Sequence, residues 1–193
     1  MYKKIYKFID SDWNSAIAFL WGFAEATVFF IIPDVYITFV FLFSVRSGFI
    51  AIIWSIIGSI AGAVCIYLLH MLSYNYASVL VMIPGITLKM ITHGLQLFRQ
   101  DVFPGFSTVP FSGIPYKIYV YSAARFSVPF YLFVVWTVIA RIIRYAFPIS
   151  VILIIQKFCK KNIKKHIRFW LLLFFAVWIL FYTWYFFIIY RIY

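Results

Sequence analysis

The stretch that decides the fold is Ala24–Asp34, AEATVFFIIPD, which lies inside an otherwise apolar segment covering residues 16–45. It carries two carboxylates, Glu25 and Asp34, in a run that is otherwise suited to hydrocarbon. An ionised carboxylate near the centre of a bilayer costs roughly 3 kcal/mol or more, so a chain retains one there only when other groups offset that cost. The stretch therefore predicts a functional site as well as a membrane anchor.

Pro33 predicts that this segment is not one straight helix. Proline removes a backbone donor and clashes with the preceding helical turn, which favours a helix, a break and a second helix. In an unbroken helix, the nine-residue spacing of Glu25 and Asp34 would place them on opposite faces, at about 3.6 residues per turn. A reversal of the chain between them would direct both carboxylates toward one cavity.

The composition indicates an integral membrane protein. Of 193 residues, 66% are hydrophobic and 24% aromatic, against roughly 45–50% apolar residues in soluble domains. Each spanning helix needs about 20 apolar residues, so the length favours a single membrane domain over residues 1–193. The largely polar first fifteen residues argue against a cleavable signal peptide, and insertion is expected to use internal segments.

The net charge of +12 comes from 17 Lys and Arg against 5 Asp and Glu. Most of these cations flank apolar segments, which favours a cytoplasmic position facing anionic lipid rather than binding to nucleic acid. Cys65 and Cys159 do not indicate a disulfide framework, and the sequence lacks Cys/His spacing typical of a metal site. The two basic clusters are Lys3, Lys4 and Lys7, and Lys157, Lys160, Lys161, Lys164, Lys165 and Arg168.

The expected architecture is an all-α integral membrane protein with two re-entrant helical hairpins and about three transmembrane helices. The second hairpin is predicted because Pro110 and Pro115 interrupt a segment that is too apolar for a solvated loop. Interruptions by Pro129 and Pro148 are also expected in the long helix that follows. In order, the predicted segments are a first re-entrant hairpin at 16–45, a transmembrane helix at 49–72, interfacial helices at 73–100, the second hairpin at 101–124, a transmembrane helix at 126–155, a basic cytoplasmic loop at 157–168 and a transmembrane helix at 169–190.

Topology gives an independent check. If both basic clusters are cytoplasmic, the chain crosses the membrane an even number of times between them. This holds if both broken segments are re-entrant, and it also holds if both span the membrane.

Two features of the long helices bear on packing and binding. Gly58 and Gly62 form a small-x-x-x-small face that allows another backbone to approach closely. Arg141 and Arg144 are three residues apart, so they share a helix face deep within an apolar segment, where an arginine pair is expected to point into the bundle. Two broken segments, each followed by a long helix, also suggest an inverted repeat with a binding site between its halves.

In this order, the residues resemble a known family. The resemblance runs from about Phe23 to Phe147, and it is to the DedA/VTT superfamily of SNARE-associated-type membrane proteins, especially its small YqaA-like bacterial branch. The motifs that carry it are Glu25-x-x-x-Phe29-x-Ile31-x-Pro33-Asp34-Val35, Gly58-x-x-x-Gly62-x-x-x-x-Tyr67, Gly113-Ile114-Pro115-Tyr116-Lys117 and Ala140-Arg141-x-x-Arg144-Tyr145.

The resemblance implies a protein of the bacterial inner membrane that moves lipids, such as undecaprenyl phosphate or phospholipids, between leaflets as a flippase or scramblase. It also implies opposed hairpins and dependence on the proton gradient. The chain departs from the family pattern at Phe30 and Ile32, where prolines are usual, and at Arg125, where a glycine is usual. Arg125 adds a cation near the second hairpin.

The predicted site binds an anionic headgroup and protons, with no cofactor or metal. Arginine forks suit phosphate oxygens, whereas the carboxylates are expected to neutralise the arginines in the unloaded state and to take up protons when substrate arrives. An alternative is that the acids only pair with the arginines to hold the hairpins in place. The candidate substrate- and proton-binding residues are Glu25, Asp34, Lys117, Arg125, Arg141 and Arg144, with hairpin breaks at Pro33, Pro110 and Pro115.

The sequence also admits functions other than lipid transport. The second hypothesis is a proton-coupled transporter for a small solute or ion. A membrane enzyme is disfavoured because His70, His93 and His166 are scattered and accompany no nucleophile motif. A purely structural assembly protein would use Gly58 and Gly62 for association, which also allows a homo-oligomer, but it would leave the buried charges without a role.

Overall fold

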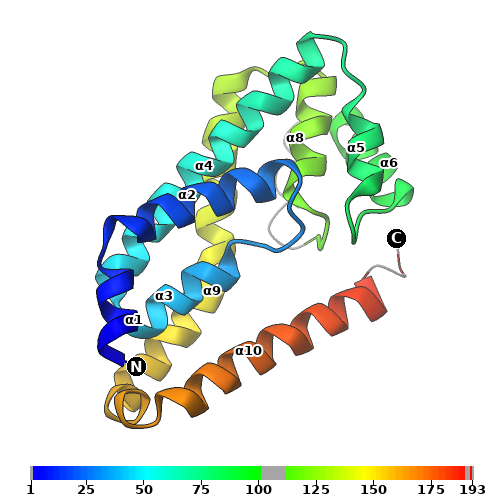
Figure 1. Ribbon diagram of the computed structural model, residues 1–193. Helices are drawn as coiled ribbons and strands as arrows, with labels where there is room; N and C mark the ends of the chain where they lie inside the picture. Colours follow the sequence, from blue (N-terminus) through cyan, green and yellow to red (C-terminus); the bar gives the residue numbers. More distant parts are fainter. Residues whose placement is uncertain (1, 101–111, 190–191, 193) are drawn as a thin grey trace.

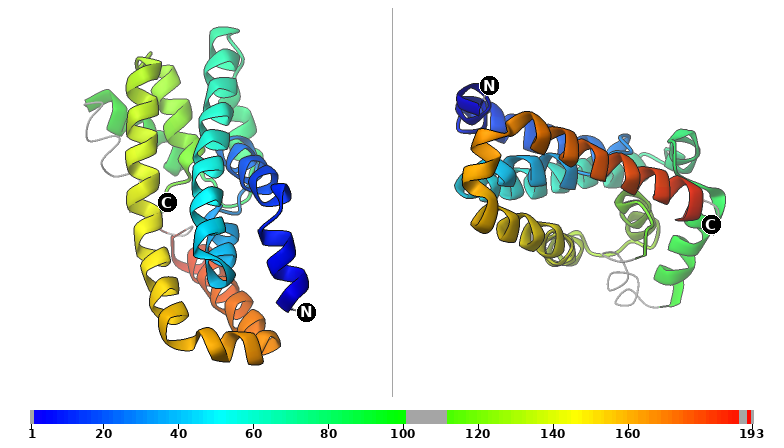
Figure 2. Two further views of the ribbon diagram at one scale, coloured as in Figure 1. Left: turned by 90° about the vertical axis from the view of Figure 1, so that its left-hand side faces the viewer. Right: turned by 90° about the horizontal axis from the view of Figure 1, so that it is seen from below.

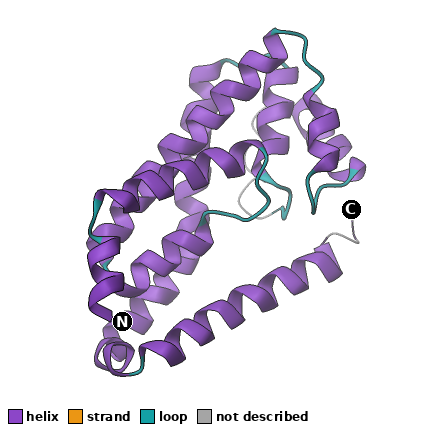
Figure 3. Ribbon diagram, viewed as in Figure 1, coloured by secondary structure: helices purple, strands orange, loops and turns teal. Residues whose placement is uncertain are grey.

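The computed structural model describes residues 2–100, 112–189 and 192, which form helices joined by loops and contain no strand (Figure 3). The all-α prediction is confirmed. Three of the helices are long and apolar enough to cross a membrane, which indicates an integral membrane protein. They are α4 (Val45–Met71), α9 (Phe130–Lys165) and α10 (Ile167–Trp184), which continues as a π-helical turn, η1 (Tyr185–Ile189).

The first broken segment consists of two helices that run in opposite directions (Figure 1). A short N-terminal helix, α1 (Tyr2–Ile9), leads into α2 (Asp12–Thr27), and α3 (Asp34–Phe43) begins directly after Pro33. The chain then returns to its starting point, because the Asn14 side-chain amide donates a hydrogen bond of 3.0 Å to the Ser47 carbonyl at the start of α4. The predicted order of helix, break and helix is therefore present.

Small residues bring α2 and α4 into backbone contact. A Cβ added to Gly58 would lie 2.0 Å from the Phe19 carbonyl oxygen, and one added to Gly22 would lie 2.1 Å from the Ser55 carbonyl oxygen. Gly62 meets the same helix one turn further on. The two helices run side by side in the same direction, since residues near the start and end of α2 meet residues near the start and middle of α4. Only glycine permits this separation.

Two short helices, one after Pro33 and one after Pro115, each pack on the long helix from the other half of the chain. In the C-terminal half, α5 (Tyr76–Met82) and α6 (Leu88–Gln100) precede α8 (Tyr116–Arg125), which follows Pro115. Helix α3 contacts α9, and α8 contacts α4. The two long helices α4 and α9 stand side by side (Figure 2). The first residues of α3 and α8 line the same central cavity, so the positive ends of both helix dipoles face it.

Several sequence-based boundaries differ from the structure. Helix α9 starts after Pro129 but continues through Pro148, because packing against neighbouring helices offsets the lost backbone bond. The basic segment predicted as a loop at 157–168 is helical as far as Lys165, since it contains no glycine or proline and lysine favours helix. Pro110 and residues 101–111 of the predicted second hairpin lie outside the described residues. The basic end of α9 and the N-terminus lie at the same end of the molecule (Figure 1).

Candidate functional site

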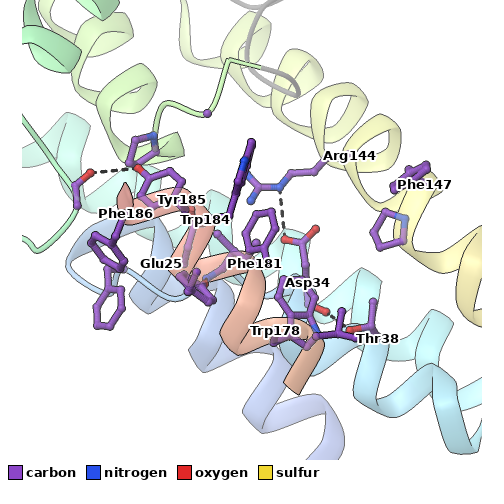
Figure 4. A pocket seen from close by; sticks show the side chains of 18 of the residues that line it. Glu25, Asp34, Thr38, Arg144, Phe147, Trp178, Phe181, Trp184, Tyr185 and Phe186 are labelled. Carbon is purple, nitrogen blue, oxygen red and sulfur yellow. Dashed lines mark hydrogen bonds and ion pairs between the residues drawn. The ribbon is translucent and has the colours of Figure 1, made fainter. Parts of the chain in front are cut away.

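A cavity of about 800 Å³ lies at the centre of the molecule, where α3 and α8 begin. Its lining includes four charged side chains from four helices: Glu25 of α2, Asp34 of α3, Lys117 of α8 and Arg144 of α9. Figure 4 shows Arg144 and Asp34 pointing toward one another from facing helices. The reversal of the first segment at Pro33 directs both of its carboxylates to this cavity.

Glu25 forms the more deeply buried of two ion pairs. Its carboxylate accepts a hydrogen bond from the Arg141 guanidinium, and the two side chains are 1% and 2% exposed. The Tyr116 ring lies against the other side of Arg141, with 4.1 Å between the guanidinium carbon and the ring centroid, which adds a cation–π interaction. Arg141 thus lies behind Glu25 and does not itself line the cavity. Its Nε and Nη1 atoms have no hydrogen-bond partner among the described residues.

Asp34 forms the second ion pair, and this one faces the cavity. Its Oδ2 atom lies 3.3 Å from Nε of Arg144, whose side chain is 21% exposed. As the first residue of α3, Asp34 also interacts favourably with the dipole of that helix. Pro148, four residues after Arg144, lacks the N–H group that would bond the Arg144 carbonyl in a regular helix. Because Arg144 lines the cavity and Arg141 does not, Arg144 is the arginine that a ligand in the cavity can reach.

Lys117 completes the charge cluster. It is 1% exposed, and its ammonium donates a hydrogen bond of 3.0 Å to the Phe29 carbonyl in the break between α2 and α3. The cluster therefore contains three buried or half-buried cations and two carboxylates, which leaves one formal positive charge. This balance favours an anionic ligand.

Side chains from four helices satisfy the backbone groups of the break at residues 28–33 and of the last residue of α2. Besides Lys117, the Trp21 indole donates to the Ile31 carbonyl, the Tyr76 hydroxyl donates to the Thr27 carbonyl, and the Ile32 N–H donates to the Tyr182 hydroxyl. Burial raises the pKa of Tyr76 above its ordinary value, so this hydroxyl remains protonated as a donor. Non-helical backbone that is removed from water requires such partners.

The structure does not bring every predicted residue to the cavity. Arg125 lies exposed in the last turn of α8, at the opposite end from Lys117, and does not line the cavity. Pro33 and Pro115 directly precede the short helices, and Gly58 and Gly62 lie against α2.

Sequence reasoning predicted that the acids pair with the arginines, but it missed the aromatic partners of the break and of Arg141. Trp21, Tyr76, Tyr116 and Tyr182 lie among many other aromatic residues in a chain that is 24% aromatic, so composition does not distinguish them. Only Tyr116, adjacent to Lys117 and Pro115, falls within one of the quoted motifs.

Comparison of the chain with protein-family models, curated proteins and solved structures finds no match. Among the described residues, no group of three His, Cys, Asp or Glu side chains is arranged to hold a metal ion. The charge cluster and the cavity around it are therefore the features of the chain that bear on its function.

Proposed function

We propose that this protein is a membrane transporter that moves a lipid with an anionic phosphate headgroup, such as undecaprenyl phosphate or a phospholipid, across the bilayer. The observation that carries the proposal is the cavity in which Lys117 and Arg144 face two carboxylates within an apolar bundle. Taking a phosphate into hydrocarbon costs several kcal/mol or more, at roughly the scale of any buried ion, unless fixed cations and dipoles replace its water.

The arrangement of the two short helices supports this function. Half-helices whose N-termini meet near the middle of a membrane domain are a recurring way to bind anionic groups in transporters. In this chain, α3 and α8 both begin at the cavity. We infer two opposed re-entrant hairpins related as an inverted repeat, which is also what the DedA/VTT resemblance implies. The basic end of α9 and the N-terminus are then cytoplasmic, at a bacterial inner membrane.

The two ion pairs suggest separate roles in transport. Arg144 is partly exposed and can exchange Asp34 for a headgroup phosphate, whereas Arg141 remains held by Glu25. A phosphate that takes Asp34's place favours protonation of that carboxylate, because its cationic partner is then neutralised. This exchange provides a route for coupling transport to protons.

The test is headgroup translocation in proteoliposomes. We expect Arg144→Gln to lower the flux of a fluorescent anionic phospholipid at least ten-fold, because the reachable cation is lost. Arg168→Gln serves as the matched control, since Arg168 is an exposed arginine outside the cavity, and its flux should stay within two-fold of the wild type. Unchanged flux in folded Arg144→Gln protein would refute the proposal.

A second candidate, a proton-coupled transporter of small anions, uses the same cations. The two candidates are distinguished by loading the same vesicles with inorganic phosphate and measuring its flux. Phosphate flux that depends on Arg144 without lipid flux would favour this alternative.

A further inference from the structure

The central cavity has two chemically different parts. Its charged end contains Asp34 and Arg144, whereas beyond Thr38 the walls supplied by α3, α9 and α10 carry only apolar and aromatic side chains. Figure 4 shows Trp178 and Phe181 of α10 close to the charged end. The apolar part, which we call the groove, is lined by Leu42, Phe147, Pro148, Val151, Ile152, Ile155, Trp170, Leu173, Phe174 and Val177.

Helix α10 is a wall of this groove and is otherwise little packed. Only 6% of the residues in its most apolar window are buried inside the protein, compared with 39% in α4. At one end it is joined to α9 through His166, and Phe174 packs against Phe39 of α3. At its other end, the Tyr182 hydroxyl accepts a bond from the Ile32 N–H. The helix therefore spans the cavity and contacts the rest of the protein at a few positions along its length.

We propose that the groove is a binding subsite for the hydrocarbon chain of the transported lipid, separate from the headgroup site at Arg144. The inference rests on the proposed function, because the ligand is the same anionic lipid. Charge complementarity identifies the occupant: a phosphate at Arg144 places whatever is attached to it at the entrance of a groove without charged groups. An apolar chain matches those walls, whereas a soluble anion leaves them uncovered.

The dimensions fit a lipid chain. The groove positions on α10 run from Trp170 to Val177, about 10 Å at roughly 1.5 Å per residue. The chains of one leaflet extend through half of a hydrocarbon core about 30 Å thick. The groove can therefore hold most of an extended chain while the headgroup remains at the cations.

The experiment uses the full chain in vesicles that contain a phosphatidic acid analogue with a photoreactive diazirine at the end of its acyl chain. After illumination, crosslinked residues are identified by mass spectrometry. We expect labelling concentrated on the groove faces of α3, α9 and α10, and at least five-fold below that on outward-facing residues such as Ile53 of α4. Unlabelled long-chain phosphatidic acid should compete, and a short-chain soluble phosphate ester should not.

A matched pair of variants on α10 tests the location. Val177 lines the groove, whereas Ile179 does not, and both are more than half exposed, so both positions admit a larger side chain. Val177→Trp should lower groove labelling at least five-fold, and Ile179→Trp should leave it within two-fold of the wild type. The wild-type labelling map tests the proposal even if Val177→Trp does not fold.

The outcomes separate this inference from the proposed function. Groove labelling without lipid flux in the wild type refutes the transport function alone. Lipid flux with labelling spread evenly over the outer surface refutes the subsite alone. Disulfide-linked dimers of a Val177→Cys variant that the wild type does not form under the same oxidation, with no lipid label in the groove, would show that a second copy occupies it and would also refute the subsite.

Discussion

Helices α4 and α10 are both long and apolar, but they are held in opposite ways. Glycines let α4 contact the backbone of α2, whereas α10 reaches the rest of the protein through aromatic side chains across a cavity. Hydropathy does not distinguish the two, since their mean values are 2.4 and 2.2. The small residues, and not the apolar ones, therefore identify the long helix that packs closely against the rest of the protein.

The largest loss of stability should come from disrupting the close contact between α2 and α4. Gly58→Leu would force α2 away, because a Cβ meets the Phe19 carbonyl at 2.0 Å. We expect a loss of about 5 kcal/mol in the free energy of unfolding, above the roughly 1–3 kcal/mol usual for overpacking, because the obstructing atom belongs to the backbone. Unfolding by SDS in mixed micelles measures it. Ile57→Phe on the exposed face of the same helix is the control, and equal stability of the two variants would contradict the packing argument.

Breaking the deeper ion pair should have the next largest effect. Glu25→Gln leaves the guanidinium of Arg141 buried without a counter-charge, which costs about 3–5 kcal/mol. The double variant Glu25→Gln/Arg141→Gln removes both charges and should recover part of this loss. A double variant that is less stable than Glu25→Gln would show that Arg141 stabilises the fold without Glu25.

Neutralising the acid of the cavity-facing pair should lower the free energy of unfolding by a smaller amount. Asp34→Asn affects an arginine that is 21% exposed, and water can replace part of the lost interaction. We expect roughly 1–2 kcal/mol, between the values for exposed and buried pairs. Measured beside Glu25→Gln in the same micelles, an equal or larger loss would mean that Arg144 is as enclosed as Arg141.

The smallest effect should fall on α10. Tyr185→Phe removes the hydrogen bond of 3.1 Å from this hydroxyl to the Gly85 carbonyl, worth about 1 kcal/mol. Because α10 is little packed, we expect faster hydrogen exchange in α10 and unchanged exchange in α4, as measured by mass spectrometry. Equal acceleration in both helices would show that α10 and α4 open together.

The sequence predicted the features that depend on single residues with strong physical consequences. Pro33 indicated the break, and the cost of burying Glu25 and Asp34 indicated a site. It did not indicate which acid pairs with which arginine, because that depends on how α9 is rotated against α2 and α3. Pro148 was expected to interrupt a helix that in fact continues, since tertiary packing outweighs the local penalty.

The break between α2 and α3 has a consequence for how the protein is made. The Ile32 N–H in this break donates its hydrogen bond to the Tyr182 hydroxyl, and Tyr182 is synthesised 150 residues later. Until α10 leaves the ribosome and enters the membrane, the nascent chain holds an open backbone donor at the tip of its first hairpin. This donor therefore gains its partner only after α10 has been made, and we expect chains truncated before Tyr182 to be degraded faster by membrane proteases than the full chain in a pulse–chase experiment.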